Sequence, residues 1–201
     1  MKTINQQPPN VFGTPEIPYL YLLILEIDEK IKREITAIKT NFGREFRSLH
    51  ALNSIPHITL CQFVSILNFE EKMLNELEMV SEKSNSFKLK LNNFSGFQPH
   101  TIYIQIDSKP DFVELVKNIK TNVKIPIKTK YGKAGFSFTP HITIAKELSK
   151  DQYELGLNKY SQNTYQADFI AKKMVLLRKP FGKSGNYHIV KEFDLKEIIH
   201  D

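Results

Sequence analysis

The sequence has little of what marks exported, membrane-bound or disulfide-stabilised proteins. Its 201 residues include one cysteine, Cys61, so no internal disulfide can form, which fits a reducing cytoplasm. The longest apolar run, residues 19–27, already contains Glu26 and is far shorter than a membrane span, so it predicts a buried strand. The opening MKTINQQPPN lacks the apolar core of a secretory signal. We therefore expect a cytoplasmic protein with no membrane partner.

Neither a low-complexity segment nor a block of like charge interrupts the chain, although the chain as a whole is basic. Lysine and arginine number 28 against 22 acidic residues, which gives a formal net charge of +6 and a pI of about 9.2. A basic surface favours anionic partners such as nucleic acid, but a lysine-rich solvated surface explains the charge equally well. Several lysines are scattered over expected strands and loops: Lys90, Lys124, Lys128, Lys130 and Lys133. Charge thus supports an anionic substrate without identifying one.

Composition and periodicity divide the chain into a tail and one domain of the α+β class. Residues 1–15 hold three prolines and a glycine with little apolar periodicity, which predicts a flexible tail, and residues 16–201 are expected to form a single domain. Short apolar runs predict strands at 17–28, 54–64, 87–97, 101–107, 137–145, 165–178 and 186–195, with an extended segment at 125–131. Helical spacing of apolar residues predicts helices at 29–40, 68–84, 110–120 and 149–159.

One short segment occurs twice. Residues 56–60 read PHITL and residues 140–144 read PHITI, with the two histidines 84 positions apart. A random arrangement of six histidines and eleven threonines in this length would give about 0.3 His-x-Thr triplets. The sequence has two, each preceded by proline and followed by an aliphatic residue, and each expected in a strand followed by a helix. Two copies indicate two similar halves that face each other, because a repeat array would need more copies at a shorter period.

Strand geometry predicts which side chains of the repeated segment lie together. Side chains alternate between the faces of a strand, so His57 and Thr59 project together while Ile58 and Leu60 face the opposite way, into the core. The second copy repeats this arrangement. Two such strands side by side would place two imidazoles and two hydroxyls around one cleft.

This set of groups suits phosphodiester chemistry. Imidazole titrates near neutrality, so of His57 and His141 one can take a proton from the nucleophile while the other protonates the leaving oxygen. The hydroxyls of Thr59 and Thr143 can donate hydrogen bonds to the non-bridging phosphate oxygens. A single histidine in a strand is more often structural than catalytic, but the matched pair reverses that expectation.

At these residues the sequence resembles the 2H phosphoesterase superfamily, which is named for two H-x-[TS] motifs, one in each lobe. Its members include RNA 2′,3′-cyclic phosphodiesterases once named 2′-5′ RNA ligases. The resemblance implies a bilobal α+β fold over about residues 17–197, with two antiparallel sheets and flanking helices around a central cleft. It also implies that His141 is the base and His57 the acid, and that Thr59 and Thr143 bind the substrate. Because the motifs supply proton transfer and hydrogen bonds but no ligand set, we expect that no metal or cofactor is needed.

Lys146 is a further candidate for substrate binding that the resemblance provides. Many members carry a basic residue, often arginine, five positions after the second histidine, and here that position is Lys146. Lysine keeps the charge but lacks the bidentate fork of arginine. Strict alternation would turn Lys146 to the side of Ile144, so it reaches the cleft only if the strand ends or bulges there.

The predicted function is hydrolysis of 2′,3′-cyclic phosphate ends of RNA, or of related nucleotide 2′-5′ or cyclic diesters, by a monomer. Two alternatives keep the same fold: a non-catalytic nucleotide- or RNA-binding module, and 2′-5′ RNA end-joining. A third alternative is a metallohydrolase with His57 and His141 as ligands, which is weakened by the lack of a third ligand at metal-site spacing.

Four other side chains have weaker claims to the site. Strict alternation puts Cys61 on the His57 face, where a small buried residue is a better interpretation than a reactive thiol. Three aromatic residues precede the second motif and could stack on a base, although core packing is the ordinary role for each: Tyr131, Phe136 and Phe138.

Overall fold

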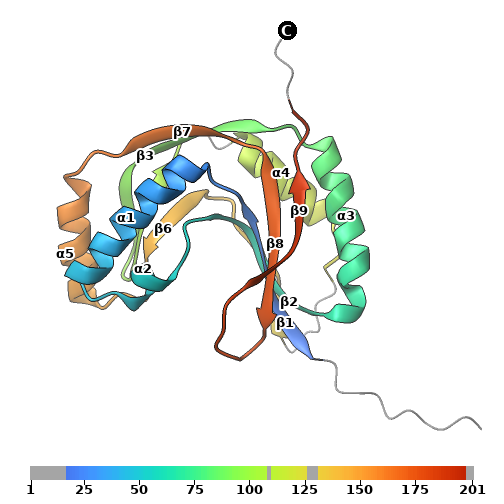
Figure 1. Cartoon of the computed structure of the whole chain (residues 1–201), viewed down its shortest axis with the longest axis horizontal. Helices are drawn as coiled ribbons and strands as arrows, with labels where there is room; N and C mark the ends of the chain where they lie inside the picture. Colours follow the sequence, from blue (N-terminus) through green and yellow to red (C-terminus); the bar gives the residue numbers. More distant parts are fainter. Residues whose placement is uncertain (1–16, 108–109, 126–130, 198–201) are drawn as a thin grey trace, which may run out of the picture.

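The computed structural model describes residues 17–107, 110–125 and 131–197 (Figure 1). The predicted flexible tail at 1–15, two of the scattered lysines (Lys128 and Lys130) and most of the predicted extended segment at 125–131 lie outside the described residues. None of the helices within the described ranges combines the length and the apolar character that a membrane crossing requires.

The strands described form one antiparallel sheet. They are β1 (Pro18–Leu25), β2 (Ile58–Ile66), β3 (Phe87–Phe97), β4 (Thr101–Ile106), β5 (Gly135–Phe136), β6 (His141–Ala145), β7 (Gln166–Ala171), β8 (Lys173–Pro180) and β9 (His188–Asp194). The helices are α1 (Glu29–Glu45), α2 (Leu49–Asn53), α3 (Glu70–Lys83), α4 (Pro110–Asn122) and α5 (Lys150–Ser161), with a 3₁₀ turn at Leu67–Phe69. The strand order is β7-β3-β4-β6-β2-β1-β8-β9, and β5 lies beside β2.

The sheet consists of two halves that meet at the repeated segments. Strands β7, β3, β4 and β6 form the His141 lobe, and β2, β1, β8 and β9 form the His57 lobe. The halves are joined by one residue pair, Ile58 with Ile142, whereas the neighbouring ladders run over several pairs. In Figure 1 the whole sheet bends into an arch. The predicted α+β class with antiparallel strands is confirmed, and the two predicted sheets are the halves of one sheet, joined through this pair.

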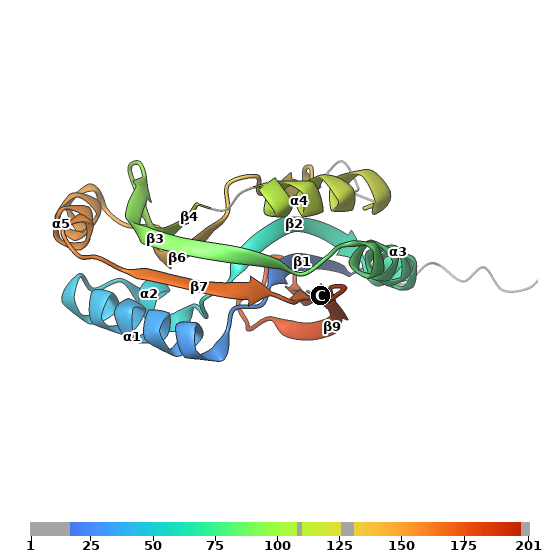
Figure 2. The same cartoon turned by 90° about the horizontal axis from the view of Figure 1, so that it is seen from above.

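The helices connect the two lobes as well as covering them. α5 packs on β3 and β4 of the His141 lobe, and α3 packs on β9 of the His57 lobe. α1 follows β1 of the His57 lobe but packs against β6, and α4 follows β4 of the His141 lobe but packs against α3 (Figures 1 and 2). Each lobe therefore contributes one helix to the cover of the other, so neither lobe has a complete core by itself.

Several elements differ from the prediction in extent. The helix predicted at 29–40 continues to Glu45 and passes through Gly43, where a Cβ would lie 2.6 Å from Leu52 Cγ. The lack of a side chain at Gly43 therefore lets Leu52 of α2 pack closely against α1. The sequence pattern did not reveal α2, because five residues are too few to show a helical period. The single strand predicted at 165–178 is two strands, β7 and β8, which belong to different lobes.

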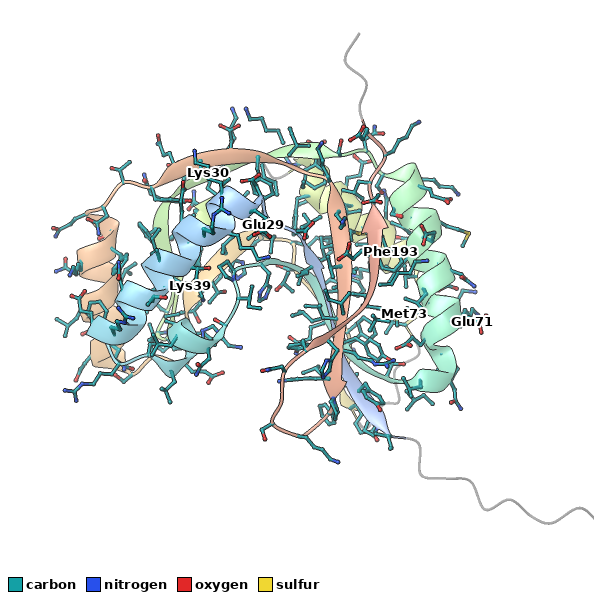
Figure 3. The ribbon with its side chains drawn as sticks, viewed as in Figure 1. Glu29, Lys30, Lys39, Glu71, Met73 and Phe193 are labelled. Atoms are coloured by element: carbon teal, nitrogen blue, oxygen red, sulfur yellow. The ribbon has the colours of Figure 1, made fainter. Side chains whose placement is uncertain are left out.

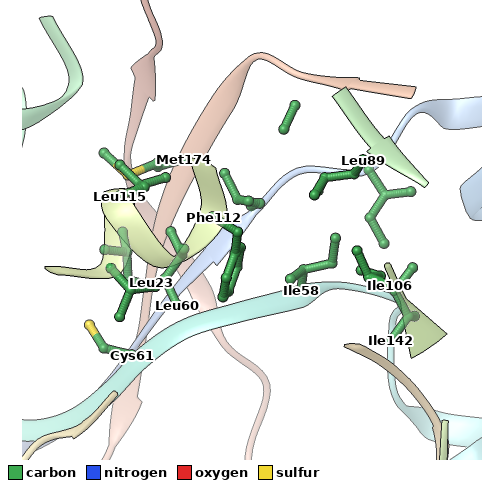
Figure 4. Close-up of a cluster of buried hydrophobic side chains, with 14 of the residues drawn as sticks. Leu23, Ile58, Leu60, Cys61, Leu89, Ile106, Phe112, Leu115, Ile142 and Met174 are labelled. Atoms are coloured by element: carbon green, nitrogen blue, oxygen red, sulfur yellow. The ribbon is translucent and has the colours of Figure 1, made fainter. Parts of the chain in front are cut away.

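The core contains the inner residues of both repeated segments. Ile58 and Ile142 are fully buried and lie in one cluster with Leu23, Leu60 and Phe112 (Figure 4). Full burial of an aliphatic side chain of this size contributes roughly 1.5–3 kcal/mol to stability. The isoleucine between histidine and threonine thus anchors each strand, while its two neighbours remain on the opposite face.

Candidate active site

The two repeated segments lie side by side and run in opposite directions. Ile58 pairs with Ile142 between β2 and β6, and in that register His57 faces Thr143 across the strands and Thr59 faces His141. Both motifs have the same burial pattern: proline buried, histidine half-buried, isoleucine buried, threonine half-buried. The structure therefore brings the four predicted residues together on one face, which we call the histidine face: His57, Thr59, His141 and Thr143.

Each histidine ring is oriented by the same local hydrogen bond. His57 Nδ1 lies 2.8 Å from the carbonyl oxygen of Ile55, and His141 Nδ1 lies 2.8 Å from that of Thr139. Both carbonyls precede the motif proline, which restricts that residue to an extended conformation. A carbonyl oxygen can only accept, so Nδ1 carries the hydrogen and Nε2 is left to exchange a proton with a ligand. Neutral, each ring presents a base at Nε2; protonated, it presents an acid.

Burial and nearby cations lower the pKa of both histidines. For His141, burial lowers the pKa and the bond to Thr139 opposes the shift. For His57, burial is again the main cause, the bond to Ile55 opposes it, and the positive charges of Lys39 and Lys146 lower the pKa further. Both rings are therefore mostly neutral at pH 7 without a ligand, and an anion bound beside them would raise their pKa values.

Two matching β-bulges follow the motifs. The register of β1 with β2 shifts between Leu23 and Ile24, which leaves Leu60 as the extra residue. The register of β4 with β6 shifts in the same way, which leaves Ile144 as the extra residue. Each bulge lies three residues after a motif histidine and reverses the alternation of side chains beyond it.

The first bulge corrects the expected orientation of Cys61. Cys61 pairs with Leu23 on the core side rather than sharing the His57 face, because Leu60 uses an extra position in the strand. The thiol is 1% exposed, and burial raises its pKa to about 12. The interpretation as a small buried residue rather than a reactive thiol is confirmed.

The second bulge affects Lys146, which was expected to reach the cleft only if its strand ended or bulged nearby. β6 ends at Ala145. Because Ile144 is an extra residue, Lys146, the position after Ala145, lies on the side of Thr143 rather than on the side of Ile144. Lys146 lies close enough to His57 to lower its pKa, and its Nζ is 3.8 Å from Glu147 Oε1 at an exposed site. The charge of Lys146, which directly follows the strand of His141, thus lies near His57.

Two aromatic residues that the sequence did not single out surround His141. The ring of Phe97 lies 5.0 Å from the imidazole and that of Tyr103 lies 5.2 Å away, and the two rings stack at 4.2 Å. Phe97 keeps 38% of its surface exposed. Tyr103 is the cross-strand neighbour of Thr143, a pairing that no local pattern reveals.

The aromatic residues that the sequence did single out have other partners. Phe136 pairs with Cys61 between β5 and β2, and Phe136 and Phe138 both lie under the ammonium of Lys120. Tyr131 packs edge-on against Phe181 at 5.5 Å.

A buried lysine and a third histidine near His57 were also missed. Lys39 on α1 and His50 on α2 both interact electrostatically with the His57 side of the site. Lys39 continues the apolar stripe of Ile31 and Ile35 at a spacing of four residues. A charged residue within the apolar stripe of a helix indicates a buried charge, and the sequence alone shows this pattern. Within residues 17–107, 110–125 and 131–197, no three histidine, cysteine or carboxylate side chains gather as a metal site would.

The chain is similar to bacterial proteins that are provisionally named phosphoesterases. A Bacillus pumilus protein provisionally named a phosphoesterase is 24% identical over 124 residues, which cover 60% of this chain and 68% of that protein. A Geobacillus kaustophilus protein with the same provisional name is 27% identical over 124 residues, with the same two coverages.

Two solved structures share the fold at low sequence identity. Escherichia coli LigT complexed with 3′-AMP has a TM-score of 0.61 at 15% identity, with 89% of this chain and 98% of LigT covered. The Thermus thermophilus protein TT0787 has a TM-score of 0.65 at 14% identity and the same coverages. The model of the 2′-5′ RNA ligase superfamily matches residues 27–180, which include both motifs and both bulges. The chain therefore belongs to the 2′-5′ RNA ligase superfamily, as its resemblance to the 2H phosphoesterases implied.

Proposed function

We propose that this protein is a metal-independent phosphoric diester hydrolase. Its substrates would be 2′,3′-cyclic phosphate ends of RNA, or small nucleotide 2′-5′ and cyclic diesters, and His57 and His141 would act as an acid/base pair. One observation carries the proposal: on two neighbouring strands, the same hydrogen bond from Nδ1 leaves Nε2 of each histidine available for proton transfer. The provisional phosphoesterase names of the relatives are consistent with it.

The reaction needs one neutral and one protonated imidazole. Nε2 of the base takes a proton from water while the water oxygen bonds to phosphorus, and Nε2–H of the acid protonates the ribose oxygen as its bond to phosphorus breaks. The products are a ribose hydroxyl and a phosphate monoester. The positive charges of Lys39 and Lys146 make the imidazolium of His57 a stronger proton donor, which suits the acid role.

Binding of the phosphate would use the other members of the histidine face. The hydroxyls of Thr59 and Thr143 can donate hydrogen bonds to the non-bridging oxygens, where charge concentrates in the transition state. Lys146 adds a positive charge near His57, and a lysine holds an anion as a point charge rather than through a planar fork. These three residues are the proposed substrate-binding set, and the histidine face together with Lys146 defines the proposed central cleft.

A nucleotide substrate would give the aromatic rings of Phe97 and Tyr103 beside His141 a role in binding. The exposed ring of Phe97 offers an apolar surface next to the proposed phosphate site. E. coli LigT, which shares the fold, has been solved with 3′-AMP, ATP and NADP⁺. We further propose a monomer in the cytoplasm, without a cofactor or a membrane partner, whose residues 16–201 form a single bilobal domain after a flexible tail at 1–15.

A substrate panel on chelator-treated protein tests the proposal. We expect turnover of at least one of four 2′,3′-cyclic nucleotides, an RNA oligonucleotide with a 2′,3′-cyclic phosphate end, or a 2′-5′-linked dinucleotide. The control is the His57→Ala, His141→Ala double variant, which should stay at background. Activity should survive dialysis against EDTA, because acid/base transfer by two imidazoles uses no metal.

Three results of the panel would contradict the proposal. Nucleotide binding without turnover would indicate a binding module. Loss of activity with EDTA and its return with Zn²⁺ or Mn²⁺ would indicate a metallohydrolase. Joining of the cyclic end to a 5′-hydroxyl RNA, without hydrolysis, would indicate an end-joining enzyme.

A further inference from the structure

Lys39 carries a positive charge into the interior of the protein. The residue lies on the face of α1 that packs against β6, and only 2% of its surface is exposed (Figure 3). Lysine is almost never fully buried unless its ammonium is hydrogen-bonded, since removing the charge from water costs several kcal/mol. A buried ammonium at this position is therefore held by its surroundings.

The ammonium group connects the two motifs. Lys39 Nζ donates to Ser54 Oγ at 2.8 Å, and to the carbonyl oxygens of Thr143 and Ile144 at 3.0 Å each. Thr143 belongs to the second motif and Ile144 is the extra residue of its bulge. Ser54 lies three residues before His57 in the segment that leads into the first motif. All three ammonium hydrogens thus have an acceptor, one in the segment that leads to His57 and two on β6, the strand that begins at His141.

The three acceptors are neutral, so they do not cancel the charge. Burial, with a smaller contribution from the nearby Lys146, lowers the pKa of Lys39 to about 8, so the group is mostly charged at pH 7. Lys39 in turn lowers the pKa of His57. The other charged or titratable groups that act on His57 are Lys146 after β6 and His141 on β6. His50 on α2 is mostly neutral at pH 7, because burial and these cations lower its pKa to about 4.

We propose that Lys39 is a positioning residue for the acid/base pair. Its ammonium fixes the bulge of the second motif relative to the segment that carries His57, and it keeps a positive charge near His57. This inference rests on the proposed function for its kinetic consequence only. The relation between Lys39 and the titration of His57 is a property of the folded protein and can be measured without a substrate.

Three variants separate the hydrogen bonds from the charge. Lys39→Met removes both, Lys39→Gln keeps amide donors without charge, and Lys39→Arg keeps a charge and several donors. Because Lys39 lowers the pKa of His57, loss of its charge must raise that pKa. NMR titration of the histidine Cε1–H signals should therefore show His57 titrating at higher pH in Lys39→Met and Lys39→Gln than in wild type. Lys39→Arg should titrate like wild type.

The pH–rate profile on a 2′,3′-cyclic nucleotide gives the kinetic test. Lys39→Met should lower kcat by about tenfold or more, the scale expected when reacting groups lose their alignment, with KM changed much less. One limb of the profile should move to higher pH in Lys39→Met and Lys39→Gln and return in Lys39→Arg. The limb that moves is the one that His57 controls: the alkaline limb if the pKa of His57 is the higher of the two, and the acidic limb if it is the lower.

An unchanged His57 titration in Lys39→Met and Lys39→Gln would overturn the inference. If Lys39→Met does not fold, the comparison of Lys39→Gln with Lys39→Arg carries the same test. A shifted titration in a protein without diesterase activity would leave the electrostatic relation standing and contradict the proposed function instead. A loss of kcat that Lys39→Arg does not recover, with both limbs in place, would show that Lys39 serves stability alone.

Discussion

His57→Ala and His141→Ala are each expected to lower kcat on a 2′,3′-cyclic nucleotide by at least about 100-fold, the usual scale for loss of a general acid or base. Either change removes the only free Nε2 that its motif contributes to the site. The melting temperature should change little, because both rings are half-buried on the histidine face and each bonds the carbonyl of the residue two positions before it, in the segment that leads into the strand. The measurements are steady-state kinetics and thermal unfolding of both variants.

The controls for this prediction come from the same chain. His188→Ala alters an exposed histidine on β9 and should keep wild-type turnover. The double variant should be about as slow as the slower single variant, because residues that act as a unit are not additive in their effects. Near-wild-type turnover in either single variant would refute the assignment of that histidine.

The second large effect is expected at the threonines. Thr59→Val and Thr143→Val should each lower kcat by about 10- to 100-fold, somewhat below the loss seen for a fixed oxyanion-hole donor, because a hydroxyl can rotate. Valine keeps the β-branched shape and strand preference of threonine. At position 143 the backbone carbonyl that accepts from Lys39 also remains. KM and kcat are measured for both variants and for the matched serine variants.

Serine is the control that isolates the hydroxyl. Thr59→Ser and Thr143→Ser retain the donor and should recover most of the turnover that valine removes. If valine and serine gave the same rates at both positions, the hydroxyls would have no part in the transition state.

The sequence could predict those features of the site that depend only on residues close together along the chain. Alternation in a strand places His57 and Thr59 on one face and buries Ile58, and the structure has this arrangement in both motifs. The coincidence of two nearly identical segments then suggests that the strands meet. The family and the α+β class follow from the same residues.

What the sequence could not predict depends on contacts between distant segments. The bulges at Leu60 and Ile144 exist because β1 and β4 pair with the motif strands in a shifted register, and that register is not visible in the motifs themselves. The orientation of Cys61 and of Lys146 follows from these bulges. Phe97 and Tyr103 reach His141 only because β3, β4 and β6 are adjacent in the sheet.

The pH–rate profile of hydrolysis tests the acid/base account most directly. An acid and a base acting together require one imidazolium and one neutral imidazole, so kcat/KM should be bell-shaped against pH, with limbs that belong to the coupled pair. Burial holds both pKa values below the ordinary value of 6.5, so the maximum for the free enzyme should lie on the acid side of neutrality. The limbs of kcat should lie at higher pH, because bound phosphate favours the charged form of a nearby imidazole.

Glutamine variants of the two histidines complete this measurement. His57→Gln and His141→Gln keep a polar side chain without a titrating group, so each should lose one limb from its residual activity. Wild type and both variants are compared on one cyclic nucleotide at constant ionic strength. The account predicts a bell for wild type and a single limb for each variant. A flat wild-type profile between about pH 5 and 9, the range over which histidines titrate, would contradict it.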